Sequence, residues 1–162
     1  MNDYKAVNYW NYRHERLGFN LHGVGDISKT HEENAILLNE GARVFLEVCE
    51  KANVNFSNPE VLDTGCGTGH FAEVLKNKGV RKYRGIDIVD TLFKELKVKF
   101  PEYEFDRLDV SCQKIQGKYN LTLAMDVLQH IVNEEKFHFA INNIKLCRGC
   151  TKSEELFISL YV

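Results

Sequence analysis

An apolar stretch that ends in an acid and runs into three alternate glycines constrains the fold more than any other feature of this chain. It spans residues 61–69 and reads VLDTGCGTG. Glycine has no Cβ and tolerates positive φ, so such a loop between a strand and a helix brings main-chain N–H groups close to a bound group. Apolar residues at Phe71, Val74 and Leu75 predict that helix, with Gly79 as its C-terminal cap.

The spacing of the glycines separates two classes of ligand. The dinucleotide fingerprint would need a glycine at position 70, where this chain has His70. A loop with an acid followed by Gly-x-Gly-x-Gly resembles motif I of the class I S-adenosylmethionine-dependent methyltransferases, in which the loop wraps the methionine part of the cofactor. A nicotinamide-dependent oxidoreductase stays as the less favoured alternative. The resemblance implies cofactor contacts for Asp63, Gly65, Cys66, Gly67 and Gly69, with Asp63 binding N–H groups of the loop.

Three further segments follow in the order that this family shows. Residues 83–88 predict a second strand, whose Asp87 lies 22 residues after Gly65. That is close to the spacing of about 20 residues at which an acid meets a ribose hydroxyl. Residues 103–110 predict a third strand that ends near the adenine position, and residues 119–131 resemble the fourth motif, which opens into the active site. The resemblance covers about residues 55–160 and implies further cofactor contacts for Asp87, Ile88, Asp109, Val110, Met125 and Asp126.

The alternation of apolar strand and helix patterns predicts the fold class. It favours an α/β, doubly wound, Rossmann-like and mainly parallel sheet with right-handed crossovers, and the resemblance implies the strand order 3-2-1-4-5. With 162 residues, 44% of them apolar, the chain is expected to form one domain. Residues 1–54 would supply N-terminal helices and a lid-like loop, and residues 55–162 the cofactor-binding core.

Local signals place the expected helices. Aromatic and charged residues predict a helix over residues 3–17, and the glycines of residues 18–26 predict a mobile loop after it. A capping box at residues 30–33 predicts a helix from about 31 to 52. Asp90 is expected to cap the helix that follows the second strand.

The end of the sequence departs from the family. Class I methyltransferases normally continue beyond strand five with a hairpin, whereas this sequence stops after an apolar strand at residues 156–162, so the final antiparallel hairpin is absent. An uncovered apolar edge of this kind is unusual. We expect the chain to be a fragment of a longer protein, or to form a homodimer through this edge. Cys147 and Cys150 have no second pair and no histidine cluster beside them, so we expect no metal site.

Charge and composition limit the partners. A net charge of −2 gives no reason to expect nucleic acid, and the basic residues between positions 76 and 84 fall on the edge away from the ligand side, as a solvated face. The chain has no apolar run of membrane length and no secretory signal at its start. We therefore expect a cytoplasmic protein without a membrane partner, whose five cysteines are free thiols.

The expected cofactor implies the chemistry. Methyl transfer from a sulfonium is an in-line displacement, in which the enzyme mainly orients two reactants. His130 is the candidate general base for a hydroxyl acceptor, with a structural role as the alternative. Aromatic and basic residues gather at positions 9–14. Aromatic faces suit a sulfonium and Arg13 suits its carboxylate, although a helix packed on the sheet edge would explain the same cluster.

Absent motifs narrow the acceptor. Residues 125–127 lack the Pro-Pro-aromatic signature of enzymes that methylate exocyclic amino groups of DNA or glutamine. Both prolines, Pro59 and Pro101, precede glutamate rather than the cysteine nucleophile of cytosine C5 methylation. A small-molecule acceptor, methylated on oxygen or nitrogen, remains. The alternative is a cofactor-binding module without activity of its own, which needs a missing C-terminal part or a partner chain.

Overall fold

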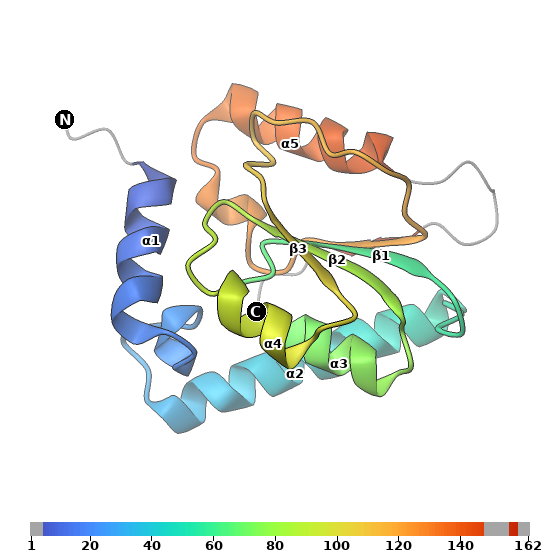
Figure 1. Cartoon of the computed structure of the whole chain (residues 1–162), viewed down its shortest axis with the longest axis horizontal. Helices are drawn as coiled ribbons and strands as arrows, with labels where there is room; N and C mark the ends of the chain where they lie inside the picture. Colours follow the sequence, from blue (N-terminus) through green and yellow to red (C-terminus); the bar gives the residue numbers. More distant parts are fainter. Residues whose placement is uncertain (1–4, 148–155, 159–162) are drawn as a thin grey trace.

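A five-stranded parallel sheet with the order β3-β2-β1-β4-β5 forms the centre of the chain. This computed structural model describes residues 5–147 and the backbone of residues 156–158. The strands are β1 (Glu60–Thr64), β2 (Lys82–Asp87), β3 (Glu104–Arg107), β4 (Leu121–Leu123) and β5 (Leu156–Ile158). The order and the parallel pairing confirm the predicted doubly wound α/β fold (Figure 1).

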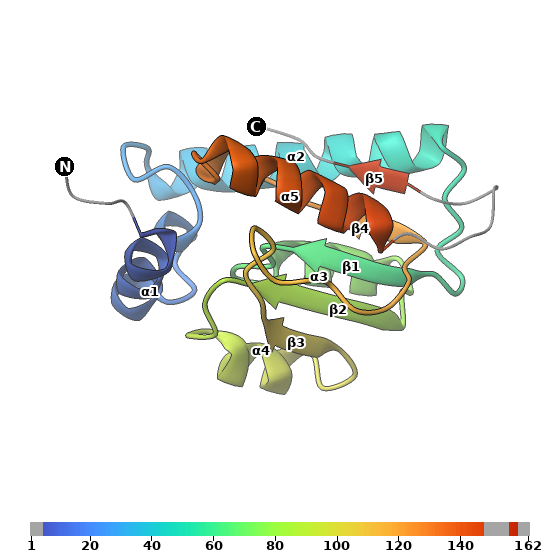
Figure 2. The ribbon, with the colours of Figure 1, turned by 90° about the horizontal axis from the view of Figure 1, so that it is seen from above.

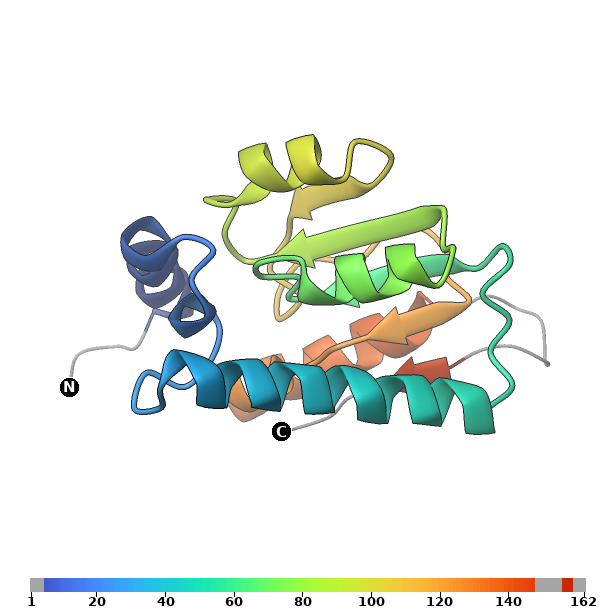
Figure 3. The ribbon, with the colours of Figure 1, turned by 90° about the horizontal axis from the view of Figure 1, so that it is seen from below.

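Helices cover both faces of the sheet, and one helix stands apart from it. The α-helices are α1 (Ala6–Leu17), α2 (His31–Lys51), α3 (His70–Asn77), α4 (Phe93–Lys99) and α5 (Glu134–Leu146), and two 3₁₀ turns are η1 (Leu21–Gly23) and η2 (Leu128–His130). Helices α2, α3 and α4 lie on one face of the sheet, and α5 covers the other (Figures 1 and 2). The strand arrows point towards α1, which therefore lies beyond the carboxyl ends of the strands (Figure 3).

Neighbouring residues of β1 build two separate cores. Val61 packs with Phe45 and Leu75 on the side of α2 and α3, whereas Leu62 packs with Ile144 on the side of α5. Successive side chains of a strand point to opposite faces, so a strand covered on both faces must be apolar at consecutive positions. This requirement explains the unbroken apolar pattern from which the strand was predicted.

The capping signals in the sequence have mixed outcomes. The capping box is present, because the Thr30 hydroxyl accepts from the Glu33 N–H at 3.2 Å and the Glu33 carboxylate accepts from the Thr30 N–H at 2.7 Å. Gly79 follows α3 with φ of 85°, as its predicted role requires. The prediction for Asp90 was wrong: α4 begins at Phe93, and Asp90 contributes only a carbonyl, which accepts the Phe93 N–H at 3.0 Å.

The segment expected as a mobile loop has regular structure. Residues 18–26 contain η1 and are bonded to helices on both sides. The Asn34 side chain of α2 accepts from the Asp26 N–H at 2.8 Å and donates to the Asp26 carbonyl at 2.8 Å. The glycines in the sequence indicated where the first helix ends. The hydrogen bonds between Asn34 and Asp26 join residues eight positions apart, and no local sequence pattern predicts them.

Three of the five basic residues between positions 76 and 84 lie in ion pairs. Lys76 pairs with Glu102 at 2.9 Å, Lys82 with Glu60 at 2.8 Å and Arg84 with Asp106 at 2.8 Å. Exposed pairs of this kind contribute little to stability, and they fit the prediction of a solvated face.

Two expectations reach the end of the chain. Residues 156–158 of the predicted last strand form β5, while residues 159–162 and Cys150 lie outside the described residues.

No helix in the described ranges 5–147 and 156–158 is long and apolar enough to cross a bilayer. Within the same ranges, no three His, Cys, Asp or Glu side chains gather in a way that could hold a metal ion.

Candidate functional site

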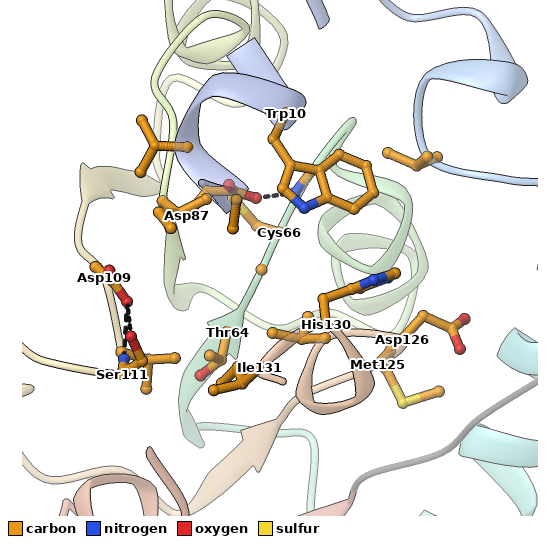
Figure 4. Close-up of a pocket in the computed structure, with 18 of the residues that line it drawn as sticks. Trp10, Thr64, Cys66, Asp87, Asp109, Ser111, Met125, Asp126, His130 and Ile131 are labelled. Carbon is orange, nitrogen blue, oxygen red and sulfur yellow. Dashed lines mark hydrogen bonds between the residues drawn. The ribbon is translucent and has the colours of Figure 1, made fainter. Parts of the chain in front are cut away.

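A cavity of about 520 Å³ lies at the carboxyl ends of the strands, with α1 forming its opposite wall. Figure 4 shows side chains from α1, from the loops after β1, β2 and β3, and from the segment around η2 converging on it. Ligands of α/β sheets bind at this edge, and the volume is in the range of cavities that hold small molecules and cofactors. The cavity is therefore the candidate ligand site.

The loop after β1 needs glycine for its backbone and for its packing. Gly65, Gly67 and Gly69 have φ of 75°, 48° and 76°, a region that side-chain-bearing residues rarely adopt. A Cβ on Gly65 would overlap Val127, and a Cβ on Gly69 would lie 2.6 Å from Leu96 Cδ2. Gly65 and Gly67 line the cavity, whereas Gly69 packs against the core.

Asp63 and Asp87 are buried carboxylates near the carboxyl ends of β1 and β2. Their hydrogen bonds differ from the prediction that Asp63 binds the glycine loop. Asp63 accepts a hydrogen bond from the Tyr83 hydroxyl at 2.6 Å, and burial raises its pKa to about 7. The first two N–H groups of the loop donate to the Ile86 carbonyl, and the third, of Gly67, donates to the Asp87 carboxylate at 3.0 Å. The prediction that Asp63 binds loop N–H groups was wrong, because β2 supplies those acceptors.

Acids at the ends of β2 and β3 line the cavity together, because their strands are neighbours in the sheet. Asp87 also accepts from the Val89 N–H at 3.2 Å, and burial raises its pKa. Asp109 accepts from the backbone N–H of Ser111 at 2.9 Å and from its hydroxyl at 2.6 Å. Ile88 and Val110, which follow these two strands, and Cys66, which follows β1, also line the cavity.

The segment after β4 brings Met125, Asp126 and His130 to the cavity. Asp126 adopts φ of 54°, and its carboxylate accepts from the Gln129 side chain at 3.3 Å. The His130 ring meets the Trp10 ring edge-on, with 5.2 Å between centroids, and the two face each other in Figure 4. Burial lowers the pKa of His130 against the opposing effect of Asp126, so the imidazole is neutral at pH 7 and able to accept a proton.

Arg13 occupies a different place from the one that its expected role requires. Its guanidinium donates to the His22 carbonyl at 2.6 and 2.9 Å and to the Gly25 carbonyl, and it bonds the Tyr9 hydroxyl at 2.8 Å. Arg13 is not among the residues that line the cavity. The guanidinium therefore fastens α1 to the η1 segment, since carbonyl groups of that segment lie within its reach.

Comparison with known proteins assigns the chain to a family. A family model described as a methyltransferase domain matches residues 12–145. The chain belongs to this methyltransferase family. Its fold is that of the class I S-adenosylmethionine-dependent methyltransferases, which confirms the resemblance of the four motifs.

Solved methyltransferases share the fold at low sequence identity. Magnesium protoporphyrin IX methyltransferase of Synechocystis PCC 6803, with bound S-adenosylmethionine, aligns with a TM-score of 0.71 and 19% identity over 91% of this chain and 74% of its own. An S-adenosylmethionine-dependent methyltransferase of Clostridium acetobutylicum ATCC 824 gives 0.65 and 19% over 96% of this chain and 57% of its own.

A viral protein is similar in sequence. Protein 235L of Invertebrate iridescent virus 6, which carries the name of a methyltransferase, is 31% identical over 94 residues. The match covers 55% of this chain and 34% of the viral protein. This methyltransferase domain thus spans about a third of the length of that relative.

Three residues of the methyltransferase domain have roles that the sequence did not predict. His14 and Thr64 line the cavity, and each carries a buried side-chain atom without a hydrogen-bond partner. His70 is hydrogen-bonded through Nε2 to the Leu38 carbonyl of α2 at 3.1 Å. One signal for His14 was available: it follows Trp10 by four residues and so lies on the same face of α1.

Proposed function

We propose that this chain binds S-adenosylmethionine in the cavity and transfers its methyl group to a small-molecule acceptor, on oxygen or nitrogen. The observation that carries the proposal is the joint placement of the glycine loop, Asp87 and Asp109 around one cavity at the carboxyl edge of the sheet. A structural neighbour holds S-adenosylmethionine, and another, the N-methyltransferase NodS of Bradyrhizobium japonicum, was solved with S-adenosylhomocysteine. These ligands support the choice of cofactor.

The residues that line the cavity fit this cofactor. Asp87 offers a carboxylate at the position where a ribose hydroxyl is expected, and burial raises its pKa against the opposing effect of backbone hydrogen bonds. His14 Nε2 and Thr64 Oγ1 are two of three buried side-chain polar atoms in the described part of the chain without a partner. Unpaired buried polar atoms are uncommon and indicate a missing ligand or water. A polar ligand in the cavity would supply partners for them.

The chain's own residues would orient the reactants and exclude water. S-adenosylmethionine, when bound, supplies a methyl group on a sulfonium for direct transfer. The Trp10 ring lines the cavity, and aromatic faces suit a nearby cation, as the Arg13 guanidinium 5.3 Å from the ring centroid already shows. Further residues of α1 form the cavity wall. For a hydroxyl acceptor, the neutral His130 imidazole would take the proton of the acceptor oxygen, and the nearby Asp126 carboxylate would stabilise the resulting imidazolium.

Calorimetry tests the cofactor, and turnover tests the reaction. The proposal predicts saturable binding of S-adenosylhomocysteine and no binding of NAD, whereas binding of NAD alone would favour an oxidoreductase. Methyl release from S-adenosylmethionine would then be measured over a panel of hydroxyl and amine metabolites. Tight cofactor binding without turnover on any of them would favour a binding module that needs a further part or a partner.

A matched pair of histidine variants tests the general base. His130→Gln is expected to lower turnover of a hydroxyl acceptor by about 10² to 10⁴ without weakening S-adenosylhomocysteine. His138→Gln is the control, because His138 is exposed on α5 and does not line the cavity. Unchanged turnover in His130→Gln would leave His130 with a structural role.

A further inference from the structure

Two buried side-chain atoms in the cavity wall have no hydrogen-bond partner, and one of them belongs to His14. His14 is 4% exposed, it lines the cavity from α1, and its Nε2 atom has no hydrogen bond. A buried polar atom without a partner destabilises a fold, because it gives up its bonds to water and gains none in return. Such an atom in a ligand cavity indicates a contact that the ligand completes.

The surroundings of His14 explain why the protein itself supplies no partner. The neighbouring Trp10 ring lies 5.7 Å away between centroids, and an indole has no acceptor and only one donor. The adjacent Arg13 is committed to the carbonyls of the η1 segment. Neither of these two neighbours is hydrogen-bonded to Nε2.

The imidazole of His14 is uncharged under ordinary conditions. Burial first, and then the charge of Arg13, lower its pKa to about 4. The neutral ring carries one N–H, and in the tautomer with the proton on Nε2 it donates a single hydrogen bond. The side chain already lines the cavity, and the terminal torsion of a histidine is broad.

The position of His14 along α1 selects one end of the ligand. His14 lies one turn after Trp10, towards η1, and its carbonyl accepts the Gly18 N–H at 2.8 Å. Val24, just after η1, packs over Gly67, since a Cβ on Gly67 would lie 2.9 Å from Val24 Cγ1. This end of α1 therefore adjoins the glycine loop, where the methionine part of the cofactor is expected.

We propose that His14 binds the amino-acid end of S-adenosylmethionine, with Nε2–H donating to its carboxylate. The proposal rests on the proposed function, because it takes S-adenosylmethionine as the ligand. It transfers to His14 the carboxylate contact that the sequence predicted for Arg13. It also gives the unpaired Nε2 atom a partner of opposite character, since a carboxylate is a strong acceptor without a donor.

Two ligands that differ in the amino-acid end test this contact. Calorimetry would compare S-adenosylhomocysteine with 5′-methylthioadenosine, which lacks that end, on the wild-type chain and on His14→Leu. We expect His14→Leu to weaken S-adenosylhomocysteine about 10- to 100-fold, as for a hydrogen bond to a charged group. The affinity for 5′-methylthioadenosine should stay unchanged. His14→Gln, whose amide N–H can replace Nε2–H, should restore most of the lost affinity.

The ligand-free stability of the same variant separates binding from folding. His14→Leu removes an unpaired polar atom from a buried position, so its thermal midpoint should equal or exceed that of the wild type. Equal weakening of both ligands, or unchanged affinity for S-adenosylhomocysteine, would overturn the proposal. A wild-type chain that binds 5′-methylthioadenosine but not S-adenosylhomocysteine would overturn it as well. Failure of the wild-type chain to bind either ligand would overturn the proposed function itself.

Discussion

Alanine at Gly65 should destabilise the fold more than alanine at Gly79. Both glycines lie in the left-handed region, with φ of 75° and 85°. An L-residue in this region costs about 1–2 kcal/mol. At Gly79 that is the whole effect, because a Cβ there would meet nothing within 4 Å. At Gly65 the new methyl group would overlap Val127, and overpacking adds about 1–3 kcal/mol. The expected loss is therefore about 2–5 kcal/mol at Gly65.

Urea unfolding followed by circular dichroism measures both losses. The double variant Gly65→Ala/Val127→Ala tests the cause, since Gly65→Ala should cost about 1–3 kcal/mol less in the Val127→Ala background than in the wild type. Equal destabilisation by Gly65→Ala and Gly79→Ala would refute the reasoning. The same would follow if Val127→Ala gave no relief, because the loop would then not be packed as described.

Three further predictions concern the protonation of Asp63, the contacts of Arg13 and the capping box of α2. Burial raises the pKa of Asp63 to about 7 from an ordinary value of 3.8, so the folded chain keeps a proton that the unfolded chain releases. The free energy of unfolding should therefore fall between about pH 4 and pH 7. Asp63→Asn should flatten this slope in urea titrations, and an unchanged slope would contradict it. Arg13→Met should weaken S-adenosylhomocysteine although Arg13 does not line the cavity, because it releases the η1 segment. Arg16→Met is the control, since among the contacts described Arg16 bonds only an exposed tyrosine. Equal weakening of S-adenosylhomocysteine by both variants would show that the bonds of Arg13 to the η1 segment do not support the cavity. Thr30→Ala should lower the free energy of unfolding by about 1 kcal/mol through loss of the capping box, and no loss would contradict that role.

The strands were predictable because each carries its own signal, and their order followed from the family resemblance. β1 and β2 both carry buried apolar residues, and each has an acid at or next to its carboxyl end, Asp63 in β1 and Asp87 in β2. The capping box of α2 is likewise a local pattern, and the structure confirms it. Asp90 shows the limit of such patterns, because a capping residue is recognised only when the first turn of the helix is placed correctly.

The contacts between elements were less predictable. Asp63 has the chemistry to bind the glycine loop, but the Tyr83 hydroxyl reaches it from the neighbouring strand, and only the register of β1 against β2 reveals that pairing. The roles of Arg13 and His14 depend on which side of α1 faces the cavity. Local sequence places both residues on one helix. The packing of α1 over the strand ends determines that His14 lines the cavity and that Arg13 does not.

A crystal structure of the chain with S-adenosylhomocysteine tests the central claim most directly. The account predicts the ligand in the cavity between the glycine loop and α1, with the ribose on the Asp87 carboxylate and the amino-acid end within hydrogen-bond distance of His14. A ligand bound elsewhere, or one with its adenosine end against His14 and its amino-acid end at Asp109, would contradict it.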